Sequence, residues 1–220
     1  MMLDFQTSLQ DADDAIGYCP DGGLNAPPRS GLKLLFDMLG AVLLLLPMLV
    51  AAAALLLLNP FFNPGPLWFV QNRMGYRCRA FPAIKFRSMT VRSVRHRGAF
   101  DPLETERITL LGRIIRRSRI DELPQIINVL RGEMSLIGPR PDAYDHAQVY
   151  LQNVPGYRRR HDVLPGITGL AQTEVGYVEG LAGLRRKVDA DLRYMSNPTL
   201  RLELWIVWRT IVVVLARRGA

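Results

Sequence analysis

The chain has 220 residues, 49% of them hydrophobic, and its 28 lysines and arginines against 20 acidic residues give a formal net charge of +8. This length suits one ordinary domain with appendages, and the two cysteines, Cys19 and Cys78, and three scattered histidines form no metal-ligand spacing. The composition argues against a disulfide scaffold and a Cys/His metal centre and favours a reducing compartment, while the basic body suits nucleic acid, an anionic membrane surface or phosphorylated substrates.

The N-terminal segment differs in charge from the rest of the chain. Five aspartates against a single arginine give residues 1–30 a net charge of −4, and glycine and proline interrupt their few apolar stretches. This composition predicts a disordered or loose tail. The segment does not resemble a secretory signal peptide, since its start is not basic and no apolar run follows directly.

The next segment is long and apolar enough to enter a membrane. Residues 38–58 are 21 residues without a charge, which suffices to cross a bilayer. Pro47 near their centre predicts a kink. Basic residues flank the segment on both sides, and such flanks favour the cytoplasmic face. A kinked re-entrant helix reconciles these features, and a straight single-pass anchor with a tolerated proline fits the sequence nearly as well.

Short extended pieces and an amphipathic segment follow. Residues 59–66 are typical of a turn-rich exit, residues 67–75 and 78–89 of short strands, and residues 91–106 of a polar, mobile loop. Residues 107–120 place isoleucines and leucines opposite arginines. This last stretch could lie on the membrane surface or pack inside the protein as a helix, and the sequence favours neither.

A helix start with two adjacent carboxylates comes next. Apolar residues follow a helical spacing after Pro124, a residue that suits a first helical turn, and Gly132 makes a plausible C-cap. Asp121 and Glu122 therefore fall at or just before a helix N-terminus, where free N–H groups and the helix dipole favour anions.

Arginines frame these two carboxylates. Four of them precede Asp121, among them Arg116, and Arg140 follows in a stiff turn between Pro139 and Pro141. The arrangement suggests a site for a polyanionic substrate. On spacing alone, ordinary helix capping with solvated arginines is the favoured interpretation.

The C-terminal part of the chain is predicted to be helical. Residues 142–162 contain a predicted helix, residues 165–169 (PGITG) a loop that allows close backbone approach to a ligand, and residues 181–195 a charged helix. Residues 202–215 are too short and charged to span a membrane. Their two tryptophans suit an interfacial helix, with ordinary core packing as the alternative.

The run SRIDELPQIINVLRGEMSLIGPRP at residues 118–141 resembles the signature of the bacterial sugar transferases, monotopic phosphoglycosyl transferases that start glycan assembly on a polyprenyl phosphate. The resemblance extends to KFRSM at residues 85–89, VLPGITGLAQ at 163–172 and residues 191–210. It implies an α+β, mostly helical fold: a small cytoplasmic catalytic domain with short strands, carried on a proline-kinked re-entrant membrane helix and interfacial amphipathic helices.

Composition predicts a tail (1–30), and the resemblance implies a re-entrant helix–break–helix (31–62) and a catalytic domain (63–220) after it. Lys33 and Asp37, four residues apart on one helix face, match family positions near the start of the membrane helix, and Pro47 matches the proline that breaks it. We expect these three residues to anchor the chain in the bacterial inner (cytoplasmic) membrane, with the catalytic domain facing the cytoplasm.

The resemblance also implies a reaction: transfer of a phosphosugar from a UDP-sugar to polyprenyl (undecaprenyl) phosphate, with release of UMP, as the first membrane step of exopolysaccharide or other glycan assembly. Asp121 would form a covalent aspartyl phosphosugar, and Glu122 would act as base or orient the acceptor. Asp121 would also bind Mg²⁺ together with the diphosphate. Lys85, Arg116 and Arg140 would bind substrate.

The partners implied are the UDP-sugar, the polyprenyl phosphate, the bilayer and downstream glycosyltransferases, without nucleic acid. Two other functions stay open. A UDP-sugar transferase that acts directly on a soluble acceptor is disfavoured by the membrane segment and the adjacent carboxylates. A non-catalytic membrane scaffold that binds anionic lipid or nucleic acid would not account for the DELPQ segment at residues 121–125 or the GPRP segment at residues 138–141.

Overall fold

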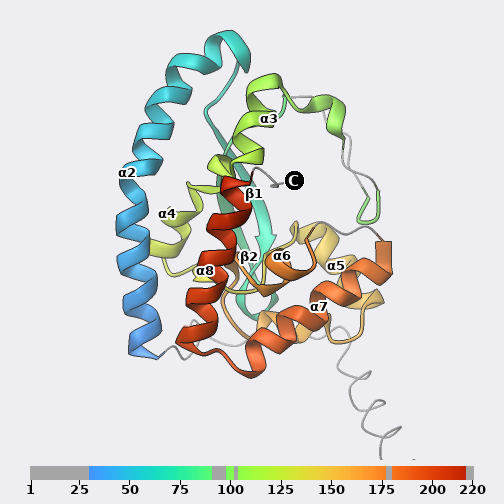
Figure 1. Cartoon of the computed structure of the whole chain (residues 1–220). Helices are drawn as coiled ribbons and strands as arrows, with labels where there is room; N and C mark the ends of the chain where they lie inside the picture. The colour runs from blue at the N-terminus through green and yellow to red at the C-terminus, as the bar shows by residue number, and fades with distance from the viewer. Residues whose placement is uncertain (1–29, 91–97, 102–103, 177–179, 217–220) are drawn as a thin grey trace, which may run out of the picture.

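The computed structural model describes residues 30–90, 98–101, 104–176 and 180–216. The predicted tail up to residue 29 and much of the predicted loop at 91–106 lie outside these residues. Figure 1 shows the helices α2 (Gly31–Phe62), α3 (Leu110–Arg117), α4 (Gln125–Leu130), α5 (Tyr144–Asn153), α6 (Leu170–Glu174), α7 (Gly180–Ser196) and α8 (Leu200–Leu215), and the strands are β1 (Trp68–Met74), β2 (Ala80–Phe86), β3 (Ser135–Ile137) and β4 (Gly166–Thr168). Short 3₁₀ helices cover Tyr76–Cys78, Thr105–Arg107, Ile120–Glu122 and Tyr157–His161.

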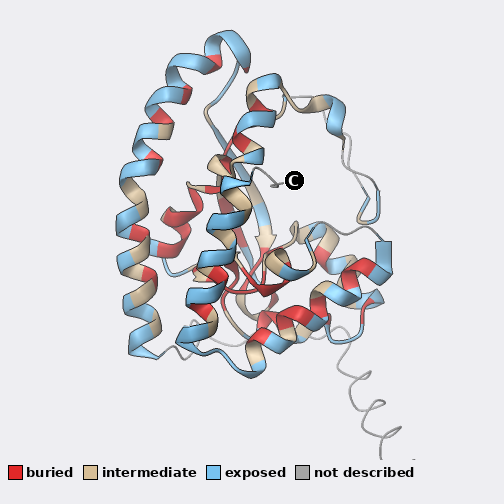
Figure 2. Cartoon of the chain, in the orientation of Figure 1, coloured by how far each residue is buried: buried red, intermediate tan, exposed pale blue. Residues whose placement is uncertain are grey.

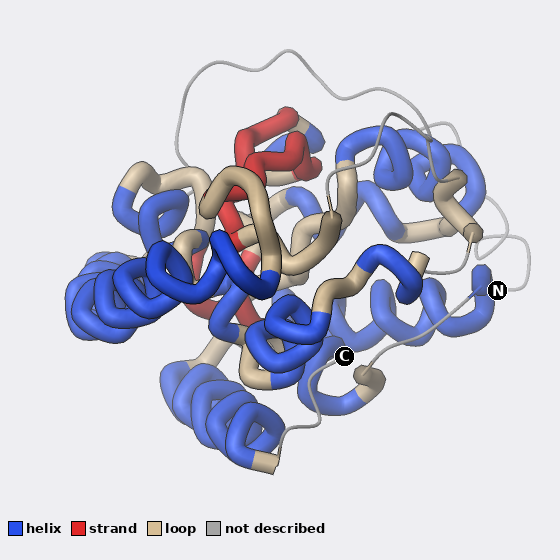
Figure 3. The backbone as a smooth tube through the Cα atoms, turned by 90° about the horizontal axis from the view of Figure 1, so that it is seen from above, coloured by secondary structure: helices blue, strands red, loops and turns tan. Residues whose placement is uncertain are grey.

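The described part of the chain is a mostly helical α+β structure, as predicted. β1 and β2 form an antiparallel hairpin, and β3 pairs in parallel with β4. Seen from above, helices lie on several sides of these strands (Figure 3). The structure confirms the predicted strands within residues 67–75 and 78–89 and the predicted helices at 142–162, 181–195 and 202–215.

The parallel pair β3–β4 corrects the prediction of a loop at residues 165–169. Each strand has three residues, too few for an alternating pattern to be recognised. Glycines permit the close pairing, because a Cβ on Gly166 would lie 2.1 Å from the backbone nitrogen of Gly138. The predicted close backbone approach therefore exists, but it joins two strands of the protein itself.

Helix α2 carries the apolar segment and is continuous over 32 residues. At 1.5 Å per residue it is roughly 48 Å long. Most of its residues are exposed, as Figure 2 shows, among them Leu43 at 76% and Leu57 at 74%. Such an apolar surface is unfavourable in water and compatible with membrane association. Helical geometry runs through Pro47, and a kink or re-entry there stays a prediction.

Polar contacts tie the first turns of α2 to the body of the protein. The fully buried Asp37 accepts a hydrogen bond from the Ser135 hydroxyl at 3.0 Å and another from the Leu136 backbone N–H at 3.0 Å. Lys33 lies 3.1 Å from Asp37 and 3.1 Å from Glu203 of α8. The predicted pair of Lys33 and Asp37 therefore forms, and it joins α2 to β3 and α8.

A buried arginine joins the other end of α2 to the hairpin. Arg87 directly follows β2 and donates hydrogen bonds to the side-chain oxygen of Asn63 at 3.0 Å and to the Pro66 carbonyl at 2.7 Å. The Asn63 amide donates in return to the Arg87 carbonyl at 2.8 Å. Because Arg87 lies two residues after Lys85, these bonds connect the end of the apolar helix to the strand that carries Lys85.

The main hydrophobic core lies between α2, the hairpin and α4. Ile126 and Val129 of α4 are fully buried and belong to one cluster with Phe81 and Phe86 of β2 and Ala41 of α2. Burial of these side chains stabilises the fold by about 25 cal/mol for each Å² of apolar surface removed from water. This packing fixes the start of α4, where the two adjacent carboxylates lie.

Helices α3 and α8 each bury one face and expose apolar residues on another. In α3, Ile115 is buried whereas Ile114 is exposed. In α8, Ile206 is fully buried whereas Trp208 and Leu215 are exposed. Each helix therefore packs against the body and also presents an apolar face that a membrane interface would cover.

Candidate active site

The two adjacent carboxylates lie in a tight turn that leads into α4. Asp121 and Glu122 belong to the 3₁₀ helix Ile120–Glu122, and Pro124 is the N-cap of α4. Both acidic residues are buried. Arg119, immediately before the turn, has a left-handed φ of +54°, which costs a non-glycine residue about 1–2 kcal/mol. The predicted position of the carboxylates just before a helix is confirmed.

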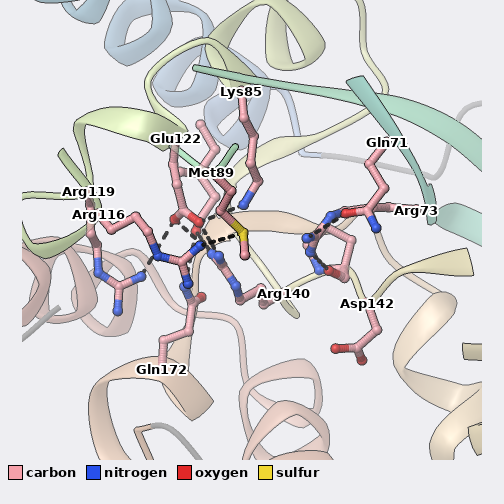
Figure 4. A network of polar contacts seen from close by, with 12 residues as sticks. Gln71, Arg73, Lys85, Met89, Arg116, Arg119, Glu122, Arg140, Asp142 and Gln172 are labelled. Carbon is pink, nitrogen blue, oxygen red and sulfur yellow. Dashed lines mark hydrogen bonds and ion pairs between the residues drawn. The ribbon is translucent and has the colours of Figure 1, made fainter. Parts of the chain in front are cut away.

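Glu122 binds three basic side chains from different segments. Arg140 of the GPRP turn donates to both carboxylate oxygens, with 2.8 Å between its Nη1 and Oε2. Lys85 of β2 donates to Oε1 at 2.9 Å, and Nη1 of Arg119 lies 3.6 Å from Oε2. Figure 4 shows these side chains converging on Glu122. The fold thus brings Lys85, Glu122 and Arg140, which are distant in sequence, into direct contact.

These contacts keep Glu122 ionised. Burial by itself would raise the pKa of Glu122, but the charges of Arg140 and Lys85 and their hydrogen bonds outweigh it, so this pKa lies well below its usual range. Burial lowers the pKa of Lys85 to about 8, against the opposing charge of Glu122. A carboxylate held in its ionised form is a weak proton acceptor. Of the two roles predicted for Glu122, orientation is therefore favoured over general base.

The Asp121 carboxylate, by contrast, accepts no hydrogen bond from any residue that the structure describes. Burial and the charge of Glu122 raise the pKa of Asp121 to about 6, against the opposing charges of Lys85, Arg116 and Arg140. At neutral pH the carboxylate is ionised, and its oxygens are not engaged by those neighbours. An ionised, unengaged carboxylate is what a nucleophile requires.

Helix α3 brings Arg116 to the same place through a close contact with the KFRSM segment. A Cβ on Gly112 would lie 1.9 Å from the carbonyl oxygen of Ser88, so only glycine permits this approach. One turn later, Nη1 of Arg116 lies 4.0 Å from the sulfur of Met89. Within the described ranges no carboxylate oxygen lies within 4.0 Å of Arg116, which leaves its charge available to an anionic ligand.

A buried ion-pair network contacts the backbone of the GPRP turn (residues 138–141). Arg160 is 1% exposed. It donates to the carbonyl of Arg140 at 2.7 Å and pairs with Asp191 at 2.7 Å and with Asp142. Lys187 also donates to Asp142 at 2.8 Å. The sequence does not reveal this network, because nothing in a run of three arginines distinguishes the buried one from its neighbours.

The three residues predicted to anchor the chain in a membrane take no part in the described contacts of this cluster. Lys33 and Asp37 contact β3 and α8, and Pro47 lies in the middle of α2. Their anchoring role stays a prediction.

The site fits a magnesium ion only if a ligand supplies most of the coordinating oxygens. Among the residues with described positions, no group of three or more His, Cys, Asp or Glu side chains could hold a metal ion. Mg²⁺ commonly takes one or two carboxylates and completes its shell with phosphate oxygens and water. Asp121 fits this pattern, since it lies beside a second negative charge and its oxygens are not engaged.

The chain is similar to known proteins over most of its length. The profile of the family described as "Bacterial sugar transferase" matches residues 28–217. The chain is 41% identical over 200 residues to "UDP-N-acetylgalactosamine-undecaprenyl-phosphate N-acetylgalactosaminephosphotransferase" of Aeromonas hydrophila, an alignment that covers 90% of this chain and 47% of that protein. It is also 38% identical over 189 residues to "Exopolysaccharide production protein PSS" of Rhizobium leguminosarum bv. phaseoli, covering 83% and 93%.

A third relative is "UDP-glucose:undecaprenyl-phosphate glucose-1-phosphate transferase" of Caulobacter vibrioides, 40% identical over 160 residues that cover 72% of this chain and 60% of the relative. The chain therefore spans about half the length of the Aeromonas protein, three fifths of the Caulobacter protein and nearly all of the Rhizobium protein.

Proposed function

This chain belongs to the bacterial sugar transferase family, and we propose that it transfers a phosphosugar from a UDP-sugar to undecaprenyl phosphate, releasing UMP. The observation that carries the proposal is the buried Asp121 carboxylate, ionised and unengaged beside a cluster of basic side chains. The names of the Aeromonas and Caulobacter relatives support the classes of donor and acceptor. The name of the Rhizobium relative supports a place in exopolysaccharide assembly.

The first step forms a covalent intermediate. A carboxylate oxygen of Asp121 attacks the β-phosphorus of the UDP-sugar, and the bond from that phosphorus to the bridging oxygen breaks. UMP leaves with the electron pair of that bond, and an aspartyl phosphosugar remains. Two anions must approach each other in this step. Lys85, Arg116 and Arg140 lower the cost of that approach because their charged hydrogen bonds bind phosphate oxygens.

The second step transfers the phosphosugar to the lipid. A phosphate oxygen of undecaprenyl phosphate attacks the same phosphorus, the bond to Asp121 breaks, and the lipid-linked diphosphate sugar forms. The attacking group is already an anion, so this step needs no strong base. Glu122 keeps Arg140 and Lys85 in place for the incoming phosphate, consistent with a pKa of Glu122 well below its usual range.

Magnesium belongs to this proposal through Asp121 and the substrate phosphates. When bound, Mg²⁺ would supply positive charge against the charge that develops on the departing phosphate. The surrounding side chains bind and orient the phosphates. A chelator should accordingly suppress UMP release, and added Mg²⁺ should restore it.

The proposed membrane arrangement follows from the exposed apolar surface. In it, α2 enters the bilayer, bends at Pro47 and returns, so that Lys33 and the catalytic domain lie on the cytoplasmic face of the bacterial inner membrane. The apolar faces of α3 and α8 would rest in the same interface. The lipid-linked product would then pass to downstream glycosyltransferases. Single cysteines before α2 and after it should be labelled from the same side of the membrane.

The decisive experiment measures UMP release from UDP-glucose, UDP-galactose and UDP-N-acetylgalactosamine with undecaprenyl phosphate and Mg²⁺. A labelled sugar should also be recovered covalently on Asp121, and Asp121→Asn should abolish both the adduct and turnover. Release of UDP in place of UMP would indicate direct glycosyl transfer and refute the proposal. An adduct retained by Asp121→Asn would exclude Asp121 as the nucleophile.

A further inference from the structure

Basic side chains outnumber acidic ones in the proposed active site. Glu122, with a single negative charge, pairs with three basic partners, Lys85, Arg119 and Arg140. Two further arginines have no carboxylate oxygen within 4.0 Å among the residues that the structure places, Arg116 and Arg73. Arg116 already has a role in the proposed function, whereas Arg73 does not.

Asp142, which lies close to Arg73 in the fold, does not supply a negative charge that pairs with Arg73. Its carboxylate is engaged by Arg160 and accepts hydrogen bonds from Lys187 at 2.8 Å and from the Tyr157 hydroxyl at 2.8 Å. These contacts hold the pKa of Asp142 well below its usual range against the effect of burial. The acidic group next to the GPRP turn is therefore already neutralised by other partners.

Arg73 lies on β1, on the face of the hairpin that carries Lys85. Phe69 is directly opposite Lys85 in the antiparallel register. Side chains two residues apart share a face of a strand, so Gln71 and Arg73 lie on that face as well. Figure 4 shows Gln71 and Arg73 at the side of the polar network, next to Arg140.

Neutral groups hold the Arg73 guanidinium without cancelling its charge. Nη1 donates to the carbonyl oxygen of Pro141, and Nη2 donates to the side-chain oxygen of Gln71 at 3.2 Å. Nε is buried without a hydrogen-bond partner in the described structure. Burial and repulsion from Arg140 lower the pKa of Arg73 to about 10, which leaves it charged at neutral pH. Two neighbouring, partly buried cations repel each other, and an anion bound to both would relieve that repulsion.

We propose that Arg73 is a substrate-binding residue whose guanidinium, together with that of Arg140, binds a substrate phosphate. The inference rests on the proposed function, because it assigns a further residue to the same site. The charge of Arg140 is already paired with Glu122. Arg73 therefore supplies the additional positive charge that a bound phosphate needs. The phosphate belongs either to the UDP-sugar or to the lipid acceptor, and both present the same chemistry to a guanidinium.

A carboxylate placed beside Arg73 tests this role without removing the arginine. Gln71→Glu keeps an acceptor for Nη2 and adds the charge that neutralises Arg73. We expect the KM for one phosphate substrate to rise by about tenfold or more, the loss of roughly one charge-assisted hydrogen bond. Single-turnover adduct formation reports on the donor, and transfer from the preformed adduct reports on the acceptor. Asn72→Asp adds the same charge on the exposed opposite face and should leave both KM values unchanged.

Binding of inorganic pyrophosphate, measured by calorimetry, gives a readout that does not depend on turnover. Gln71→Glu and Arg73→Met should each weaken this binding by about tenfold or more, and Arg73→Lys should recover part of it. A wild-type protein without turnover would refute the proposed function. The pyrophosphate-binding measurement would still test the role of Arg73. Unchanged KM values and pyrophosphate binding in Gln71→Glu would overturn the inference and leave Arg73 only a structural role at Pro141. Gln71→Glu decides the matter if Arg73→Met does not fold.

Discussion

Arg140 donates hydrogen bonds to both carboxylate oxygens of Glu122, a residue 18 positions earlier in the chain. This contact unites the start of α4 with the GPRP turn. Because Lys85 binds the same carboxylate, a single acidic residue sets the position of two cations that the proposed reaction needs. The role of Glu122 in the proposed reaction is therefore to position Arg140 and Lys85 through its negative charge.

Replacement of Glu122 by glutamine should disable the site and also destabilise the protein, because it leaves three cations without their buried counter-ion. The amide keeps the shape of the side chain but has no charge to pair with the basic partners, so Arg140 and Lys85 lose their fixed positions. We expect kcat/KM for UMP release to fall by about 10²-fold, the typical cost of losing one preorganised electrostatic group. Asp145→Asn, which removes one charge from an exposed position on α5, is the matched control. Wild-type activity in Glu122→Gln would contradict the assigned role.

Removal of Arg160 should destabilise the protein severely. The guanidinium is buried between Asp142 and Asp191 and also binds the Arg140 carbonyl. Arg160→Met would leave the buried Asp191 without its cation and the partly buried Asp142 with Lys187 alone, which should lower the free energy of unfolding by about 3–5 kcal/mol. Denaturant unfolding in detergent micelles measures the change.

The neighbouring Arg159 provides the control for this experiment, since it is exposed and lies in the same basic run. Arg159→Met should change the free energy of unfolding by less than about 0.5 kcal/mol. Equal stabilities of the two variants would show that the ion-pair network does not support the GPRP turn.

The sequence predicted the long elements of the fold because they carry strong repeating patterns. The uncharged run of α2 and the charged helix α7 extend over many turns, and the backbone groups of each helix hydrogen-bond within that helix. β3, β4 and α6 have three to five residues each and depend on partners elsewhere in the chain. The β3–β4 pairing exists because Gly138 and Gly166 allow their backbones to meet, a contact that no local pattern encodes.

For the site, the sequence revealed what is adjacent in the chain and missed what only folding brings together. Asp121 and Glu122 stand out as neighbours before a helix, Arg116 and Arg140 as arginines that frame them, and family resemblance added Lys85. Arg73 and Arg160 were not predicted as functional residues. Arg160 is buried and Arg73 partly buried next to other charges, and an arginine on a short strand or in a basic run shows no sign of this before the chain folds.

Substitution of Gly112 by alanine should displace α3 and with it Arg116. The new Cβ would lie 1.9 Å from the carbonyl oxygen of Ser88 and 2.7 Å from its carbonyl carbon, and these backbone atoms can yield only if the helix moves. We expect a loss of about 1–3 kcal/mol in the free energy of unfolding, together with a raised KM for the UDP-sugar. Thermal unfolding and UMP release measure the two effects.

The comparison for this variant is Gly31→Ala at the start of α2, where the added Cβ would meet nothing within 4 Å. Alanine there should be neutral or slightly stabilising, because it reduces the freedom of the unfolded chain. A Gly112→Ala protein as stable and active as Gly31→Ala would show that α3 can shift without cost.

Acid should destabilise the protein through His161. Burial, and secondarily the charge of Arg160, lower the pKa of His161 in the folded protein from 6.5 to about 3. Between these values the unfolded chain binds a proton at this histidine that the folded protein excludes. The contribution of His161 to stability is therefore complete above about pH 6.5 and declines toward pH 3, by up to about 1.4 kcal/mol for each pH unit.

His161→Gln tests this contribution because glutamine can still donate toward the Gly75 carbonyl, which lies 3.1 Å from Nδ1 of His161, but does not titrate. The free energy of unfolding in detergent micelles should be compared at pH 7.5 and pH 5.0 for both proteins. We expect the wild type to lose about 2 kcal/mol more than the variant over this interval, whatever the difference between them at pH 7.5. Equal losses of unfolding free energy in the two proteins would mean that His161 can take up a proton inside the folded structure. Any acid sensitivity would then come from the carboxylates of the ion-pair network.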